Sequence, residues 1–157
     1  MVDVSGVFPK VTIVSSGIPP LINITKFADD ANPIDVEHVE VTGHGINVMG
    51  ELVTWEKPAA YILSISVLAG TEDDINLRML LEESHARSGG NLANLAPTLN
   101  LRKSIGKRNI LGIVNTEDSE TYTNGKIVNG RPGAAVDSKG RKLTNTYSFV
   151  FENCVPA

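Results

Sequence analysis

The chain has 157 residues, of which 41% are hydrophobic and 20% are charged, and its formal net charge at pH 7 is −4. This balance predicts one folded domain over residues 1–157 and excludes an intrinsically disordered chain. The acidic surplus argues against electrostatic binding to nucleic acid, which usually needs a dominant basic face. The apolar runs are shorter than the roughly 18 residues of a transmembrane helix. The N-terminus lacks the pattern of a secretory signal, so we expect synthesis in a reducing cytoplasm.

Short segments rich in β-branched residues, separated by Gly, Pro, Asn and Asp, predict a mainly β protein. The segment 59–68 alternates most clearly, with Leu63 and Ile65 on one face and Ser64 and Ser66 on the other. One face of this strand is therefore expected in the core and the other is half polar. In chain order, the predicted strands are 10–14, 21–25, 36–42, 51–55, 59–68, 98–103, 110–114, 125–128 and 142–152.

One segment has the pattern of a helix, from about Glu72 to Arg87. Thr71 is the expected N-cap, with Asp74 at the capping-box position. The helix carries two apolar stripes on nearly opposite sides. The first consists of Leu77, Leu80, Leu81 and Ser84, and the second of Ile75, Met79 and Ala86. A helix packed on a sheet needs only one such stripe, so a loop or another subunit is expected to cover the second.

Three stretches rich in Gly, Asn and Ser predict flexible loops, near 43–50, 88–96 and 117–140. Trp55, the only tryptophan, follows the first of them. We interpret it as a core residue or an interface anchor, with the core favoured.

Charge is divided unequally along the chain. Residues 27–56 carry seven acids and no Lys or Arg, whereas residues 84–116 carry five bases and no acid. Opposite patches on one protomer favour head-to-tail contacts between copies. An equally weighted alternative is that the two patches meet within one monomer. Few aromatic residues accompany the densest basic group, so an acidic surface of another subunit is preferred to nucleic acid as its partner. That group is Arg102, Lys103, Lys107 and Arg108.

Patterns that carry catalysis are missing from the sequence. There is no phosphate-binding loop and no dinucleotide fingerprint. The histidines His38, His44 and His85 have no paired spacing for a metal, and Cys154 is the only cysteine. Asp29-Asp30 and Asp73-Asp74 could hold a divalent ion, but turn and helix-start roles explain these acids better. We therefore expect neither an enzyme nor a bound metal or cofactor.

The order of motifs is more informative. An acidic strand, NPIDVEHVEVTGHG, leads through a glycine-rich hairpin, INVMGELVTWEKPA, to the long strand AYILSISVLAG and the capped helix TEDDINLRMLLEESHAR, and the final strand contains TYSFVFENC. This order resembles the tail tube proteins of contractile-tailed bacteriophages and, more distantly, the ring-forming hemolysin-coregulated protein of type VI secretion. The long polar stretch 117–140 departs from the family pattern.

The resemblance implies an antiparallel β-sandwich or small barrel flanked by one helix, with six copies in a ring and rings stacked into a hollow tail tube through which DNA is ejected. It implies a structural virion protein, made in the host cytoplasm and located in the tail. Its partners would be copies of itself and the tail sheath, baseplate and terminator proteins, with non-specific passage of DNA and no membrane. The acid-rich segment would suit an acidic lumen.

The candidate subunit-interface residues are Asp35, Glu37, Glu40, Ile75, Met79, Arg102, Lys103, Lys107 and Arg108. The hairpin 42–56 corresponds to the family's ring-stacking loop, and its candidate residues are His44, Asn47, Met49, Glu51 and Trp55. Two alternatives belong to other classes. One is a monomeric β-sandwich that binds a small ligand or glycan, which the aromatic content of 5% disfavours. The other is an enzyme whose site is assembled from scattered Asp, His and Ser residues.

Overall fold

The computed structural model describes residues 7–17, 19–28, 32–85, 97–108 and 114–156. The protein is mainly β, as the sequence predicts. The elements follow in the order β1 (Val7–Ser15), β2 (Leu21–Ile24), β3 (Ile34–Val36), β4 (Thr42–Ile46), β5 (Leu52–Glu56), β6 (Tyr61–Val67), α1 (Glu72–Ser84), β7 (Leu99–Arg108), β8 (Val114–Asn129) and β9 (Asn145–Pro156).

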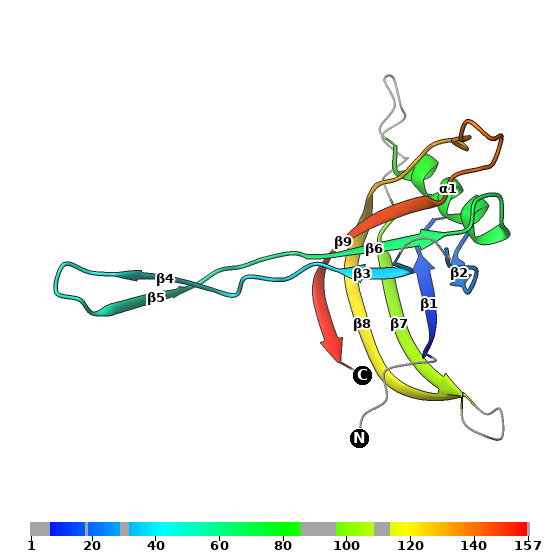
Figure 1. The fold of residues 1–157 in the computed structure, drawn as a ribbon. Coiled ribbons are helices and arrows are strands. Elements are labelled where there is room, and N and C mark those ends of the chain that lie inside the picture. Colours follow the sequence, from blue (N-terminus) through cyan, green and yellow to red (C-terminus); the bar gives the residue numbers. More distant parts are fainter. Residues whose placement is uncertain (1–6, 18, 29–31, 86–96, 109–113, 157) are drawn as a thin grey trace.

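The body is an antiparallel seven-stranded sheet in the order β2-β1-β7-β8-β9-β6-β3, and β4 and β5 form a separate hairpin (Figure 1). The chain after β2 returns to the opposite edge of the sheet, where Phe27 forms a bridge with Val67 of β6. The amide of Ala28 also donates to the carbonyl of Ser66, at 3.0 Å. The sheet is therefore strongly curved and joined to itself at one end. This arrangement confirms the predicted antiparallel fold with a flanking helix.

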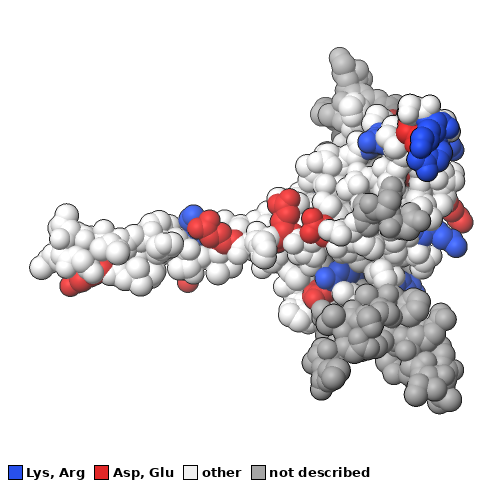
Figure 2. Space-filling model, in the orientation of Figure 1, with Lys and Arg blue, Asp and Glu red and all other residues white. Residues whose placement is uncertain are grey.

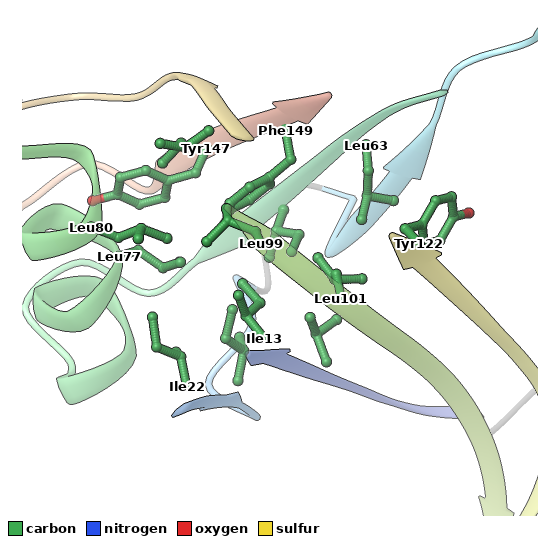
Figure 3. Close-up of a cluster of buried hydrophobic side chains, with 14 of the residues drawn as sticks. Ile13, Ile22, Leu63, Leu77, Leu80, Leu99, Leu101, Tyr122, Tyr147 and Phe149 are labelled. Atoms are coloured by element: carbon green, nitrogen blue, oxygen red, sulfur yellow. The ribbon is translucent and has the colours of Figure 1, made fainter. Parts of the chain in front are cut away.

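The core fills the inner face of the curved sheet, beneath α1. Leu77 and Leu80 of the helix are wholly buried, and they point toward Tyr147 and Phe149 of β9 (Figure 3). Burying a side chain of this size stabilises the fold by about 1.5–3 kcal/mol. The first apolar stripe predicted for the helix is thus confirmed. The helix ends at Ser84 with His85 as its C-cap, and residues 86 and 87 lie outside the described chain.

Two acids at the start of α1 attach the helix to the sheet. The hydroxyl of Thr71 caps the helix by accepting from the amide of Asp74, at 3.4 Å. The carboxylate of Asp73 accepts from the amides of Thr25 and Lys26, at 3.0 and 2.9 Å. These contacts confirm that the pair Asp73-Asp74 has a helix-start role. They also explain why β2 lies beside the N-terminal turn of the helix.

The buried carboxylate of Asp74 is the centre of a larger network. It accepts hydrogen bonds from the side-chain amide of Asn145 at 2.7 Å, from the hydroxyl of Tyr147 at 2.8 Å and from the amide of Gly70 at 3.0 Å. The guanidinium of Arg78 donates to it at 2.8 Å. Burial alone would raise the pKa of Asp74, but these donors outweigh burial and leave the pKa below its ordinary value. Helix and sheet are therefore joined by a charged group as well as by apolar packing.

Two sequence predictions differ from the structure. Residues 114–129, predicted largely as loop, form the long strand β8, which pairs with both β7 and β9. The polar run 119–124 hid this strand, because one of its faces lies outside the core. The predicted strand 36–42 is also wrong for most of its length, since pairing with β6 involves only residues 34–36. The predicted strand 110–114 falls almost wholly outside the described residues.

Candidate assembly surfaces

A hairpin arm, residues 37–60, projects far from the body (Figure 1). Its strands pair from Thr42 opposite Glu56 to Ile46 opposite Leu52. At the tip, the side-chain oxygen of Asn47 accepts from the amides of Met49 and Glu51, at 3.0 and 2.9 Å. Asn47 is thus the residue that shapes the turn. His44, another ring-stacking candidate, is exposed on β4.

The arm exposes large apolar side chains that have no partner in the described part of the protomer. Val48 is fully exposed, Met49 is 81% exposed, and Ile46 and Leu52 are 73% and 68% exposed. Single exposed apolar residues are common, but a cluster on a projecting hairpin indicates an interaction site. Trp55 lies on the same hairpin and is half-exposed, so its interpretation as a core residue is wrong.

The acids of the predicted acidic segment that the structure describes lie along the arm and at its root, whereas Asp29 and Asp30 lie outside the described residues. Figure 2 shows acidic side chains at intervals along the projection. Glu40 forms an ion pair with Lys57 at 3.1 Å, and both side chains are largely exposed. Such a surface pair contributes about 0–1 kcal/mol to stability. The exposed acids of this region are Asp35, Glu37, Glu40, Glu51 and Glu56, and Lys57 is its only Lys or Arg.

The predicted basic group does not form one surface. Lys103 is buried, and its ammonium pairs with Glu120 of the neighbouring strand β8 at 3.1 Å. The exposed residue Arg102 lies on the other face of β7, where its Nε donates to the hydroxyl of Ser119 at 3.3 Å. Lys107 and Arg108 belong to β7, but their side chains lie outside the described part. Lys103 is thus paired within the protomer, but its partner Glu120 lies outside the acidic segment 27–56, so this ion pair does not join the two predicted patches.

A different basic surface, which the sequence analysis missed, lies in the loop between β8 and β9. This basic loop, residues 130–144, exposes Lys139, Arg141 and Lys142. Asp137 organises its turn by accepting from the amides of Lys139 and Arg141, both at 2.9 Å. The amide of Arg141 is the main reason that the pKa of Asp137 lies below its ordinary value. Figure 2 shows the resulting basic group on the side of the body away from the arm. The signal in the sequence was the run DSKGRK.

The outer side of α1 is apolar. Ile75 and Met79 are 50% and 44% exposed, and together with Arg78, Glu82 and Glu83 they line a shallow depression. This is the second stripe that the sequence predicts. Within the described chain nothing buries it, so it remains available for a contact with another molecule.

Two interior strands of the sheet, β1 and β9, extend beyond their shorter neighbours β2 and β6 and leave one edge unpaired there. Residues 7–10 of β1 pair with β7 only, and residues 152–156 of β9 pair with β8 only, as far as the described residues show. An unpaired edge can add a strand from another chain. Both edges present unpaired amide and carbonyl groups, so the edge of β1 in one copy could pair with the edge of β9 in another.

The described residues contain no group of three His, Cys, Asp or Glu side chains that could hold a metal ion. Among the same residues, no helix is both long enough and apolar enough to cross a membrane.

Solved structures from contractile injection systems contain chains with a similar fold. A chain of the sheath–tube complex of the extracellular contractile injection system PVC, in its extended state, is similar with a TM-score of 0.58 and 8% identity, over 100% of this chain and 91% of that chain. A chain of the anti-feeding prophage baseplate is similar with a TM-score of 0.55 and 13% identity, over 100% and 96% of the two chains. For the protein Hcp the values are 0.50 and 10%, over 94% and 90%.

At these identities the likeness is one of fold, and it confirms the resemblance drawn from the order of motifs. A comparison of sequences finds no significant match among curated proteins. The family model described as "Tail fiber protein gp32" matches residues 2–155, and the chain belongs to this family.

Proposed function

We propose that this chain is a structural subunit of the tail tube of a contractile-tailed phage, with six copies in a ring and rings stacked into a tube through which DNA is ejected. The observation that carries the proposal is the arm, an ordered hairpin outside the body that presents Val48 and Met49 to solvent. An exposed apolar cluster of this kind is typical of an interaction site. A neighbouring ring would bury it, which gives His44, Asn47, Met49, Glu51 and Trp55 their ring-stacking role.

Ring closure follows from the sheet edges. In our proposal, residues 7–10 of one copy pair with residues 152–156 of the next, so that the sheets of six copies continue into one inner barrel. A closed barrel leaves no strand edge exposed. Ile75 and Met79 on α1 provide a second, apolar contact between neighbours.

The polar face of the sheet would then line the lumen. It carries paired hydroxyl groups, Ser64 with Ser148 at 3.1 Å and Ser66 with Thr146 at 3.0 Å. These hydroxyls are neutral and bind water, while the same face also exposes the charged residues Arg102 and Lys126. The sheath, baseplate and terminator proteins of the tail would be the other partners. The role is structural, and we assign no catalytic step to it.

The first experiment is light scattering with size-exclusion chromatography, followed by negative-stain microscopy of the eluted species. Hexameric rings or hollow tubes are expected. Elongated assemblies without a lumen would favour a tail fibre, as the family description reads, and a monomer at high concentration would favour the binding module. Replacing Val48 and Met49 with Ser should leave rings but abolish tubes. The matched control is Val14→Ser, which alters a half-exposed apolar residue of the body and should leave tubes intact.

A further inference from the structure

We propose that the basic loop of one copy is the binding site for the acidic arm of a neighbouring copy. The inference rests on the proposed function, because it names the surface that receives the arm within the assembly. The contact joins Lys139 and Lys142 of one protomer to Glu37 and Glu56 at the root of the next protomer's arm.

The first support is that the basic loop is ordered around its charges. The amide of Asp137 donates to the carbonyl of Arg141 at 2.8 Å, and the amide of Leu143 donates to the carbonyl of Ala135 at 2.8 Å. Gly140, at φ +79°, allows the turn between these bonds. The loop is a small hairpin in its own right. Its charged groups are therefore pre-organised, which lowers the entropy lost when they bind.

The second support is that the two lysines are not used within the protomer. Asp137 is occupied by backbone amides and by Arg141, whose Nε lies 3.1 Å from it. The ammonium groups of Lys139 and Lys142 have no ion-pair partner among the described residues. The side chain of Lys142 lies over Gly70, just before α1. A Cβ added at Gly70 would lie 3.0 Å from the ammonium nitrogen of Lys142.

The third support is the excess of acid on the arm. Glu37 and Glu56 are exposed and have no ion-pair partner in the described chain, while Glu40 shares Lys57. Opposite potentials on two surfaces accelerate association and fix the register of a contact more than they raise its affinity. In this division of roles, the apolar tip of the arm supplies affinity and its acidic root supplies alignment.

Geometry excludes the same contact within one protomer. The basic loop lies beside α1, whereas the arm leaves the body on the other side and extends away from it (Figure 1). Each limb of the arm runs for roughly a dozen residues, which at about 3.3 Å per residue gives a reach of roughly 35–40 Å. That reach is comparable with the diameter of a domain of this size. The partner is therefore a second copy, and the contact is head-to-tail.

The test compares charge reversals in the full chain. The loop variant is Lys139→Glu with Lys142→Glu, and the arm variant is Glu37→Lys with Glu56→Lys. The control, Lys26→Glu with Lys126→Glu, makes the same change in net charge as the loop variant, at exposed positions outside the loop, the arm and the sheet edge 7–10. We expect the loop variant and the arm variant each to raise the concentration needed for assembly at least tenfold. The variant with all four changes should return this concentration to the parent value, and the control should behave as the parent does. Near-UV circular dichroism checks that each variant is folded.

Zero-length carbodiimide cross-linking of a mixture of ¹⁵N-labelled and unlabelled parent protein provides the direct readout. Cross-links between Lys139 or Lys142 and arm acids of the other label are expected. A loop variant that assembles as well as the control would overturn the proposal, as would a four-change variant that stays unassembled without these cross-links. Hollow tubes that lack loop–arm cross-links would leave the proposed function standing and this contact refuted. Loop–arm cross-links in assemblies without a lumen would support this contact and refute the proposed tube. A monomer without cross-links would refute both proposals.

Discussion

The indole of Trp55 lies flat against Gly43, the residue directly opposite it in the β4–β5 hairpin. The ring occupies the space that a Cβ at position 43 would need, and Gly43 is buried beneath it although almost every other residue of the arm is exposed. A glycine paired with an aromatic residue across two strands thus stiffens a hairpin that has no core of its own.

Replacing Gly43 with Val should displace the indole and loosen the arm without unfolding the body. Because Trp55 is the only tryptophan, its fluorescence reports on the arm alone. We expect a red-shifted emission maximum and weaker assembly. The melting temperature should stay within about 2 °C of the parent, because surface changes away from the core rarely exceed about 0.5 kcal/mol.

Gly45→Ala is the matched control for that change. An added Cβ at position 45 would lie 3.8 Å from the nearest atom of the same indole ring, which is an ordinary contact. Its emission and assembly should match those of the parent. Equal effects at positions 43 and 45 would show that the close contact at Gly43 is unimportant.

Replacing Asp74 with Asn should destabilise the protein strongly. The side-chain amide of Asn cannot accept from all four groups that donate to the Asp74 carboxylate. The change also removes the negative charge that pairs with Arg78. Hydrogen bonds to a charged group each contribute about 1.5–3 kcal/mol, so a loss of about 2–3 kcal/mol is expected in denaturant titration. Asp137→Asn, in an exposed turn with similar local bonding, should cost clearly less.

The pH dependence of stability should carry the signature of the same carboxylate. Because the pKa of Asp74 is lower in the folded protein than its ordinary 3.8, its contribution is present above about pH 4 and disappears as pH falls through the folded value. The free energy of unfolding should therefore decline below about pH 4. Asp137 contributes with the same sign. Asp74→Asn should flatten this decline more than Asp137→Asn does, and equal slopes would assign the effect to other groups.

Gly125 of β8 should tolerate no side chain. It lies opposite Phe151 of β9, and an added Cβ would collide with the Phe151 ring and with the backbone carbonyl of Val150. Because a backbone atom cannot move aside cheaply, Gly125→Ala should destabilise the fold by about 1–3 kcal/mol. Gly133→Ala has open space around it and serves as the control in the same thermal unfolding series.

Local signals in the sequence were sufficient for several elements. The cap at Thr71, the buried stripe with Leu77 and the alternation around Leu63 depend on spacings within one element, and all three were predicted correctly. The first residue of the helix was also correct. These features are determined by neighbours in the chain, which a single sequence shows directly.

Features that depend on register between distant strands were missed. The pairing of Lys103 with Glu120 depends on the register between β7 and β8, and no pattern within either segment predicts that register. Trp55 was assigned to the core because large aromatic residues are usually buried, yet its partner is a glycine twelve residues away in a hairpin outside the core. The basic loop was missed because the stretch 117–140 was treated as one insertion, although β8 ends at Asn129.

The position of β9 has a consequence for synthesis. It lies between β8 and β6, and it supplies Tyr147, Phe149 and Phe151, the largest wholly buried side chains. The body therefore has no complete core until this strand has left the ribosome, whereas the arm, whose contacts are local, forms much earlier. In the proposed assembly, a nascent chain would therefore expose the apolar tip of the arm before residues 152–156 could pair with a neighbouring copy.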